Sequence, residues 1–266
     1  MWIKNARRQL FMAYHAPWGE VDEKNVSLFP IKTEWQNMEQ KRISLVISDD
    51  IHRVCPDFVG AALWAEVSNG SSASGLLQEM EEAERQLQER MDTERLKALP
   101  SIAATRAAYR ACGKDPSRYR PAGEQLARRV IKGAGLYRID ALVDAVNLAS
   151  LVSGYSIGGL DADKIQGGFL TLGIGREQEP YEGIGRGVLN IAGMPVYRDE
   201  AGGVATPTSD HMRTRITGTT RHLLALINGY DGNRDAVVAT ARYLEELLRR
   251  YAGCRQSEIW TYVWNG

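Results

Sequence analysis

The stretch between Thr206 and Arg221 is the most polar part of the second half of the chain. It combines hydroxyls, a carboxylate, an imidazole and guanidinium groups, and it includes Ser209, Asp210 and Thr217. Alternating hydroxyl and basic residues are typical of the solvent-exposed face of a strand. The same side chains would also suit the polar wall of a ligand pocket opposite another polar element. The residues alone leave both interpretations open.

A second group of polar side chains lies on a stretch that is otherwise apolar. Asp140, Asp144 and Asn147 follow each other at i, i+4 and i+7, so they share one stripe of a helix predicted over 140–153. Asp140 suits the N-cap of this helix, and Gly154 suits its end. Because a buried amide must find hydrogen-bond partners, Asn147 either braces a neighbouring loop or faces a pocket.

One region of the sequence is strongly basic. From Arg106 to Arg138 there are nine lysine and arginine residues, against two acidic residues, Asp115 and Glu124. A helix is predicted over 121–132 within this region. One face of that helix carries the polar side chains of Gln125, Arg128, Arg129 and Lys132. These cations either form a hydrated surface whose charge the preceding acidic helix balances, or they bind the phosphates of RNA.

The sequence lacks the motifs that hold nucleotides, metals or activated nucleophiles. Seven glycines lie from Gly167 to Gly187, but they match neither GxGxxG nor GxxxxGK[ST] and instead indicate tight turns between strands. Asp161 and Asp163 form a DxD, yet no further carboxylate or histidine cluster completes a metal site. HExxH and GxSxG are also missing. We therefore expect no cofactor and no metal.

The composition of the chain is that of a globular protein, with 44% apolar and 25% charged residues among 266. Its 33 basic and 33 acidic residues leave no net charge, so contact with a polyanion requires a local patch. Three widely spaced cysteines favour a reducing compartment. The apolar stretch 141–160 carries Asp144 and Asn147 and is a poor membrane span, and no export signal is recognised. We expect a cytoplasmic protein with no membrane contact.

The predicted elements are mainly helical in the first half and mainly strands in the second. Residues 1–37 show no period and are interpreted as an N-terminal extension, followed by a single domain over 38–266. Strands are predicted over 43–47 and 58–67, and a highly charged helix over 75–99. The remaining predictions are helices over 100–111 and 235–251 and strands over 169–172, 188–191, 195–197, 223–227 and 258–263.

Two adjacent segments carry a resemblance to a known family. Residues 138–148 read Arg-Ile-Asp-Ala-Leu-Val-Asp-Ala-Val-Asn-Leu, and residues 154–165 read Gly-Tyr-Ser-Ile-Gly-Gly-Leu-Asp-Ala-Asp-Lys-Ile. Their order, their spacing and the Asp-x-Asp-Lys ending resemble the third and fourth domains of the phenylalanyl-tRNA synthetase β subunit. The chain is more similar still to the free-standing proteins built on this module. In the synthetases the module removes wrongly attached tyrosine from tRNA. The resemblance implies an α+β fold of three layers, two β layers with packed helices.

Two positions depart from the family pattern. Where the family has a threonine and a histidine that help to hold the substrate ester, this chain has Val146 and Gly158, while Asn147 is retained. The change removes directed contacts of on the order of 1–3 kcal/mol each when buried, which weakens discrimination of tyrosine. A water molecule positioned by Asn147, Ser209 or Thr217 would still allow deacylation.

The resemblance implies a tRNA-interacting protein, an aminoacyl-tRNA deacylase that acts in trans and is not a complete tRNA ligase. The alternative is a non-catalytic protein that binds an amino acid or related small molecule in the same pocket, and a structural partner of another protein is a third interpretation. We predict the pocket between the Asn147 helix and the segment 209–220, with two glycines as one wall. The predicted substrate-binding residues are Asn147, Gly158, Gly159, Ser209, Asp210 and Thr217, and the predicted RNA-binding residues are Arg128, Arg129 and Lys132.

Overall fold

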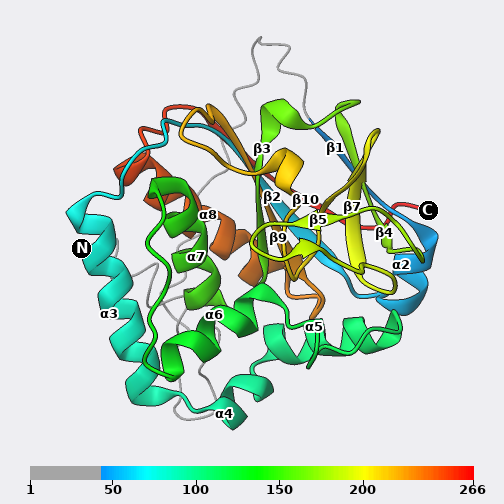
Figure 1. Ribbon diagram of the computed structural model, residues 1–266, viewed down its shortest axis with the longest axis horizontal. Coiled ribbons are helices and arrows are strands. Elements are labelled where there is room, and N and C mark those ends of the chain that lie inside the picture. The colour runs from blue at the N-terminus through cyan, green and yellow to red at the C-terminus, as the bar shows by residue number, and fades with distance from the viewer. Residues whose placement is uncertain (1–42) are drawn as a thin grey trace, which may run out of the picture.

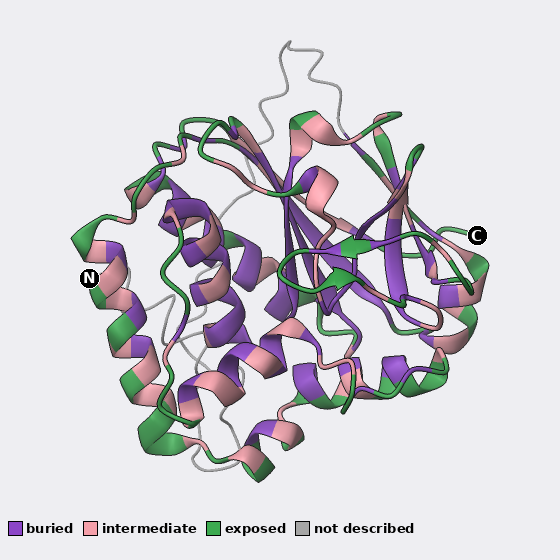
Figure 2. Cartoon of the chain, in the orientation of Figure 1, coloured by how far each residue is buried: buried purple, intermediate pink, exposed green. Residues whose placement is uncertain are grey.

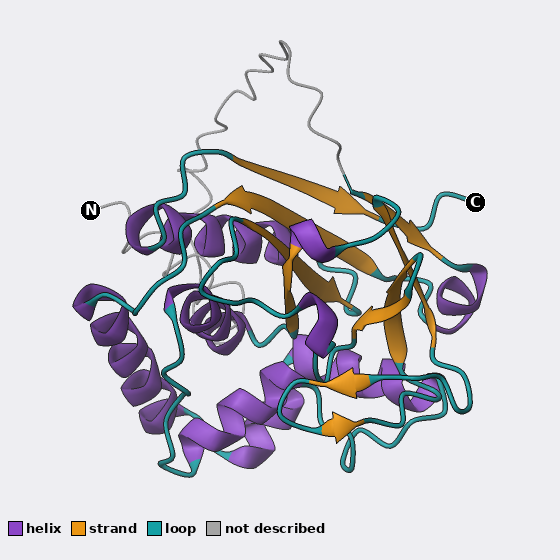
Figure 3. Ribbon diagram, turned by 45° about the horizontal axis from the view of Figure 1, so that its top comes forward, coloured by secondary structure: helices purple, strands orange, loops and turns teal. Residues whose placement is uncertain are grey.

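The computed structural model describes residues 43–266, and the predicted extension over 1–37 lies outside the described residues. Two four-stranded sheets face each other (Figure 1). The first, here called the central sheet, is covered by helices on the face turned away from the second, here called the outer sheet. The predicted α+β arrangement of two β layers with packed helices is therefore confirmed. Figure 3 shows the separation of the main helices from the outer sheet most clearly.

The central sheet is wholly antiparallel. Its strand order is β10 (Ser257–Tyr262), β2 (Val59–Glu66), β9 (His222–Gly229) and β3 (Ile157–Asp161). Because β2 and β9 lie in the middle and are covered on both faces, nearly all their residues are buried and apolar. This explains why they appear in the sequence as continuous apolar runs without alternation. β3 forms one edge of this sheet, and that edge carries the candidate site.

The outer sheet has the order β1 (Ser44–Ile47), β4 (Phe169–Ile174), β7 (Pro195–Asp199) and β8 (Gly202–Ala205). β1 pairs with β4 in parallel, and the other pairs are antiparallel. Leu170 and Leu172 on β4 point toward the central sheet, whereas Phe169 is partly exposed on the opposite face. A short hairpin of β5 (Glu182–Gly183) and β6 (Gly187–Val188) lies between β4 and β7 in the chain.

The helices pack mainly on the face of the central sheet that is turned away from the outer sheet. In Figure 2 their inward sides are buried, and the helix over Ser74–Arg90 presents an exposed side to solvent. The α-helices of the described chain are α2 (Asp49–Val54), α3 (Ser74–Arg90), α4 (Thr93–Ala98), α5 (Pro100–Ala111), α6 (Ala122–Ile131), α7 (Ala141–Ser153) and α8 (Arg234–Tyr251). Two short 3-10 helices are η1 (Ala162–Lys164) and η2 (Met212–Thr214). No helix among residues 43–266 has the length and apolar character needed to cross a membrane.

Helix α7 forms as its sequence predicts. The Asp140 carboxylate accepts a hydrogen bond from the backbone N–H of Val143 at 2.9 Å, and Gly154 ends the helix with φ of 75°. Most of its residues are buried between β3 and the neighbouring helices. Of the polar stripe, Asp144 is buried and accepts a hydrogen bond from the Ser72 hydroxyl. Asn147, for which burial was considered in the sequence, is half-buried.

Two predicted elements differ from the structure. The helix predicted over 75–99 is divided into α3 and α4, because the Asp92 side chain accepts hydrogen bonds from the N–H groups of Glu94 and Arg95 and so starts a new helix. The strand predicted over 188–191 is limited to its first residue in β6. The following residues form a connection in which Ile191 packs on Tyr181, so their apolar character reflects local core packing.

Candidate functional site

The free edge of β3 is covered by the polar segment 206–220. The carboxylate oxygen Oδ2 of Asp210 accepts the backbone N–H of Gly159 at 3.0 Å. One residue further along the strand, Leu160 forms an isolated antiparallel bridge with Arg215. Since an edge strand leaves unpaired backbone groups, the segment takes the place of a fifth strand at this edge. Asp210 thereby lies against the stretch of sequence that carries the family resemblance.

The two glycines of β3 allow this close approach. A Cβ on Gly158 would lie 3.3 Å from Oδ1 of Asp210, and a Cβ on Gly159 would lie 3.2 Å from Cδ1 of Ile216. The space beside both glycines is thus occupied by side chains of the segment itself. The pocket for which these glycines were predicted to form a wall remains a prediction.

Asp210 is the most perturbed carboxylic acid of this edge. Desolvation raises its pKa to about 7, although the hydrogen bond from Gly159 acts in the opposite direction. The position of a Cβ on Gly158, 3.3 Å from Oδ1 of Asp210, is otherwise bordered by the Cβ atoms of Ala205 and Leu226. Within the described chain, Oδ2 has a hydrogen-bond donor and Oδ1 has none. A carboxyl of this kind is able to exchange a proton near neutral pH.

The neighbouring imidazole of His211 is used in local contacts. Its Nδ1 accepts the backbone N–H of Arg213 at 2.9 Å, and its ring packs edge-on against Tyr181. Burial lowers the pKa of His211, so the imidazole is neutral at pH 7. The ring therefore helps to shape the turn after Asp210.

The hydroxyl residues predicted for the site take part in local structure. Ser209 Oγ donates to the carbonyl of Ile184 at 3.2 Å and so ties the segment to the β5–β6 hairpin. The Thr217 hydroxyl lies 3.0 Å from that of Thr219, while the carbonyl of Thr217 accepts the side-chain amide of Asn69 at 3.0 Å. Ser209 is therefore tied to the hairpin beside Asp210, whereas Thr217 is tied to Thr219 and Asn69.

Helix α7 approaches the same edge through the residue next to Asn147. The Cγ2 of Val146 lies 3.5 Å from the position that a Cβ on Gly159 would take, close to Ile216. The structure thus brings α7, β3 and the segment 206–220 together. Asn147 is half-buried, and no hydrogen bond of its side chain is found within residues 43–266. Its role as a brace or as a ligand-binding amide remains a prediction.

The basic residues of α6 are divided between internal and external contacts. The Nε of Arg128 donates to the buried carboxylate of Glu124 at 2.7 Å, and Arg129 stacks over the ring of Tyr137 at 4.1 Å. Lys132 is the C-cap residue of the helix. Acidic α3 contributes Glu84, but its partner is Arg138 and not the basic face of α6. The acidic partner of Arg128 is therefore Glu124 of the same helix.

Sequence reasoning missed the centre of this charge cluster. Glu124 is fully buried, and its carboxylate lies within 4 Å of the guanidinium groups of three arginines. They are Arg106 from α5, Arg120 from the preceding loop and Arg128 from α6. The one signal in the sequence was a glutamate at i, i+4 to both Arg120 and Arg128, which is also the pattern of an exposed ion pair.

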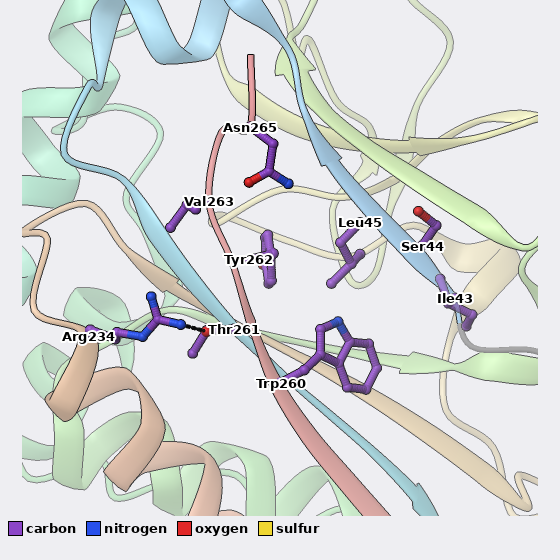
Figure 4. Close-up of a pocket in the computed structure, with 9 residues that line it drawn as sticks. All are labelled: Ile43, Ser44, Leu45, Arg234, Trp260, Thr261, Tyr262, Val263 and Asn265. Carbon is purple, nitrogen blue, oxygen red and sulfur yellow. Dashed lines mark hydrogen bonds between the residues drawn. The ribbon is translucent and has the colours of Figure 1, made fainter.

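A separate groove lies between the two sheets at the opposite edge of the fold. Figure 4 shows the side chains of Leu45 and Trp260 on its two sides, between β1 and β10. The groove has a volume of about 460 Å³, and Arg234 reaches it from α8 and contacts Thr261. None of these residues was predicted as functional, because the sequence shows only two ordinary strand segments.

Among residues 43–266 no cluster of three potential metal ligands is found.

Comparison with known proteins connects the chain with one family. The pattern of the family described as the B3/4 domain matches residues 104–253, which include α6, α7, β3 and the segment around Asp210. A structural similarity is found to an N-terminal fragment of the phenylalanyl-tRNA synthetase β subunit from Pyrococcus horikoshii, with 12% sequence identity and a TM-score of 0.42. This alignment covers 86% of the present chain and 52% of the fragment, so the chain spans about half of that structure. Curated proteins give no match.

Proposed function

Because the chain belongs to the B3/4 domain family, we propose that it binds tRNA and hydrolyses an aminoacyl-tRNA ester in trans. The observation that carries the proposal is the position of Asp210. A carboxyl with a pKa near 7 lies against the glycine pair of the family-like segment, and one of its oxygens has no donor within the described chain. This is the protonation behaviour that a general base for water requires at neutral pH.

In the proposed reaction a water molecule attacks the carbonyl carbon of the ester. The Asp210 carboxylate accepts a proton from that water as the new C–O bond forms. The tetrahedral intermediate then breaks the bond to the ribose oxygen, which takes the proton back from Asp210 and leaves as the free tRNA hydroxyl. The amino acid is released as a carboxylic acid, and no cofactor is consumed. Asn147 and Thr217 are proposed to orient the ester and the water.

The test is release of amino acid from a panel of mischarged tRNAs by the purified full chain. The variant Asp210→Asn retains the size of the side chain and an oxygen that can accept the Gly159 N–H, but it cannot take up a proton. Because the variant has no proton acceptor at this position, we expect its rate to be lower by at least on the order of 100-fold. Asp57→Asn, a change of the same kind on an exposed residue, should leave the rate unaltered. Equal rates for wild type and Asp210→Asn would refute the assignment of the base.

The same experiment separates the enzyme from the alternative, an amino-acid-binding protein. The replacements at Val146 and Gly158 favour that alternative, because they remove two polar side chains from the family's ester site. A binder would release no amino acid from any tRNA but would give heat on calorimetric titration with a free amino acid. Asp210→Asn should abolish that heat if the carboxylate receives the ammonium group.

A further inference from the structure

The cluster around Glu124 has an excess of positive charge. Three guanidinium groups face one carboxylate, whose side chain is fully buried. The nearest arginine atoms to the carboxylate lie at 2.8 Å for Arg106, 2.7 Å for Arg128 and 3.7 Å for Arg120. Each guanidinium carries one positive charge. One negative charge therefore leaves two positive charges uncompensated in this cluster.

Arg120 is the arginine that the carboxylate satisfies least. Its Nε lies beyond hydrogen-bond distance of Glu124, is buried, and has no acceptor within the described chain. One terminal nitrogen donates to the carbonyl of Ser117 at 3.3 Å. The side chain is 36% exposed, whereas those of Arg106 and Arg128 are 12% and 16% exposed. Arg120 is therefore the member of the cluster whose side chain an external anion can reach most easily.

The cluster is also held in place before any ligand arrives. Glu124 fixes Arg106 and Arg128 by hydrogen bonds, and the second terminal nitrogen of Arg106 donates to Ser117 Oγ at 3.2 Å. A preorganised guanidinium loses little conformational entropy when it binds a phosphate. Buried Glu124 thus acts as a positioning residue for the cations around it.

The position of the cluster relates it to the candidate site. The carbonyl of Tyr119 accepts the hydroxyl of Thr208 at 3.3 Å, and the carbonyl of Pro207 accepts the N–H of Ala122 at 2.7 Å. The loop that carries Arg120 is therefore joined directly to the turn that precedes Asp210. Arg120 follows Tyr119 directly in the chain, and Asp210 follows Thr208 by two residues.

We propose that Arg106, Arg120 and Arg128 form a phosphate-binding site that receives a backbone phosphate of an RNA whose aminoacylated end is presented to Asp210. The inference rests on the proposed function and names the part of the surface that holds the RNA. Arg120 makes the direct contact, and the other two arginines supply the local positive potential. Because the whole chain carries no net charge, this local excess is what favours a polyanion here.

The experiment measures binding of deacylated tRNA to the full chain at several salt concentrations. Arg120→Gln should lower the affinity and reduce the slope of log K against log salt by about one unit, since one phosphate contact is lost. Arg120→Lys retains the charge and should keep most of the slope. Arg249→Gln removes an equal charge from α8, where Arg249 pairs with Glu245, and should change nothing. Thermal melting of each variant checks that the fold is retained.

The outcomes distinguish this proposal from the proposed function. A slope that is unchanged in Arg120→Gln, or lowered equally in Arg249→Gln, overturns the phosphate site even if the protein deacylates tRNA. A slope that falls only in Arg120→Gln supports the site even if no deacylation is detected. Hydrolysis of a small aminoacyl ester without RNA gives a second readout: Arg120→Gln should leave it unaffected, whereas Asp210→Asn should abolish it.

Discussion

At the residue scale, the proton affinity of Asp210 determines how activity should depend on pH. A general base acts only when ionised, and the pKa of Asp210 is about 7. We predict that the deacylation rate rises about tenfold per pH unit below that value and levels off above it. Asp210→Asn should give a low rate without this inflection. The measurement is initial release of amino acid from mischarged tRNA across pH 5–8.5, corrected for spontaneous ester hydrolysis, with roughly half-unit steps. An inflection that persists in the variant would assign the titration to another group.

The same carboxyl predicts a pH dependence of stability with the opposite sign to that of most acidic residues. Its pKa is raised from 3.8 in the unfolded reference to about 7 in the folded protein, so the folded state holds the proton more tightly. The resulting stabilisation is complete below the unfolded pKa and is lost as the pH rises through about 7. Melting temperatures of wild type and Asp210→Asn should therefore differ in their pH trend, with the wild type losing more stability between acid and neutral pH. Parallel trends would contradict the raised pKa.

Gly158 provides a second prediction at this scale. Its φ is not in the left-handed region, so a side chain is acceptable to the backbone, but a Cβ would lie 3.3 Å from Oδ1 of Asp210 and 3.6 Å from Cβ of Ala205. Gly158→Ala should lower the free energy of unfolding in urea by about 1–3 kcal/mol, as other overpacked positions do, and should lower activity by shifting Asp210.

The family-like double variant Val146→Thr with Gly158→His gains tyrosyl-tRNA deacylation only if the Asp210 side chain moves away from position 158. Gain of that activity without loss of the pH inflection would contradict this packing argument.

At the scale of elements, buried Glu124 joins α5 to α6 through Arg106 and Arg128. Removing one partner of a buried ion pair leaves uncompensated charge at a cost of about 3–5 kcal/mol. We predict a loss of this size for Glu124→Gln in the free energy of unfolding by urea. Glu94→Gln is the matched control, because Glu94 is 79% exposed and its pair with Lys97 contributes at most about 1 kcal/mol. Equal losses of unfolding free energy in the two variants would show that the buried cluster stabilises the fold no more than an exposed ion pair does.

The boundaries of α7 and α4 show which helix ends can be predicted from the sequence. Asp140 and Gly154 bound α7 as predicted, because an N-cap carboxylate and a left-handed glycine act on backbone groups within a few residues. Asp92 acts in the same way at α4, yet it lies in a run of charged residues that is compatible with one continuous helix surface. Only the extended backbone of Met91 and Asp92 separates α3 from α4.

At the scale of the whole molecule, a buried tyrosine links the two sheets. The Tyr197 hydroxyl of β7 donates to Asn228 Oδ1 of β9 at 2.7 Å, and it lies 2.6 Å from the hydroxyl of Tyr262 on β10. Tyr197→Phe removes this link and leaves buried polar atoms unsatisfied, so we predict a loss of about 1–3 kcal/mol in unfolding free energy. Tyr137→Phe, at a 44% exposed position, should have little effect. A neutral Tyr197→Phe variant would indicate that the sheets are held by apolar packing alone.

The sequence by itself determined the class of fold, most of the helices and strands, and the family. These features depend on periodicity, caps and short motifs, which are encoded in neighbouring residues. Only the tertiary structure decided that Asp210 lies on Gly159, 51 positions earlier in the chain, and that Arg128 pairs with a buried Glu124. From the sequence, Asp210 was one of six predicted substrate-binding residues with no role of its own, and Glu124 was one of two acidic residues in a basic region. Burial and contact between distant segments give them a raised pKa or three arginine partners, and neither is encoded within a local window.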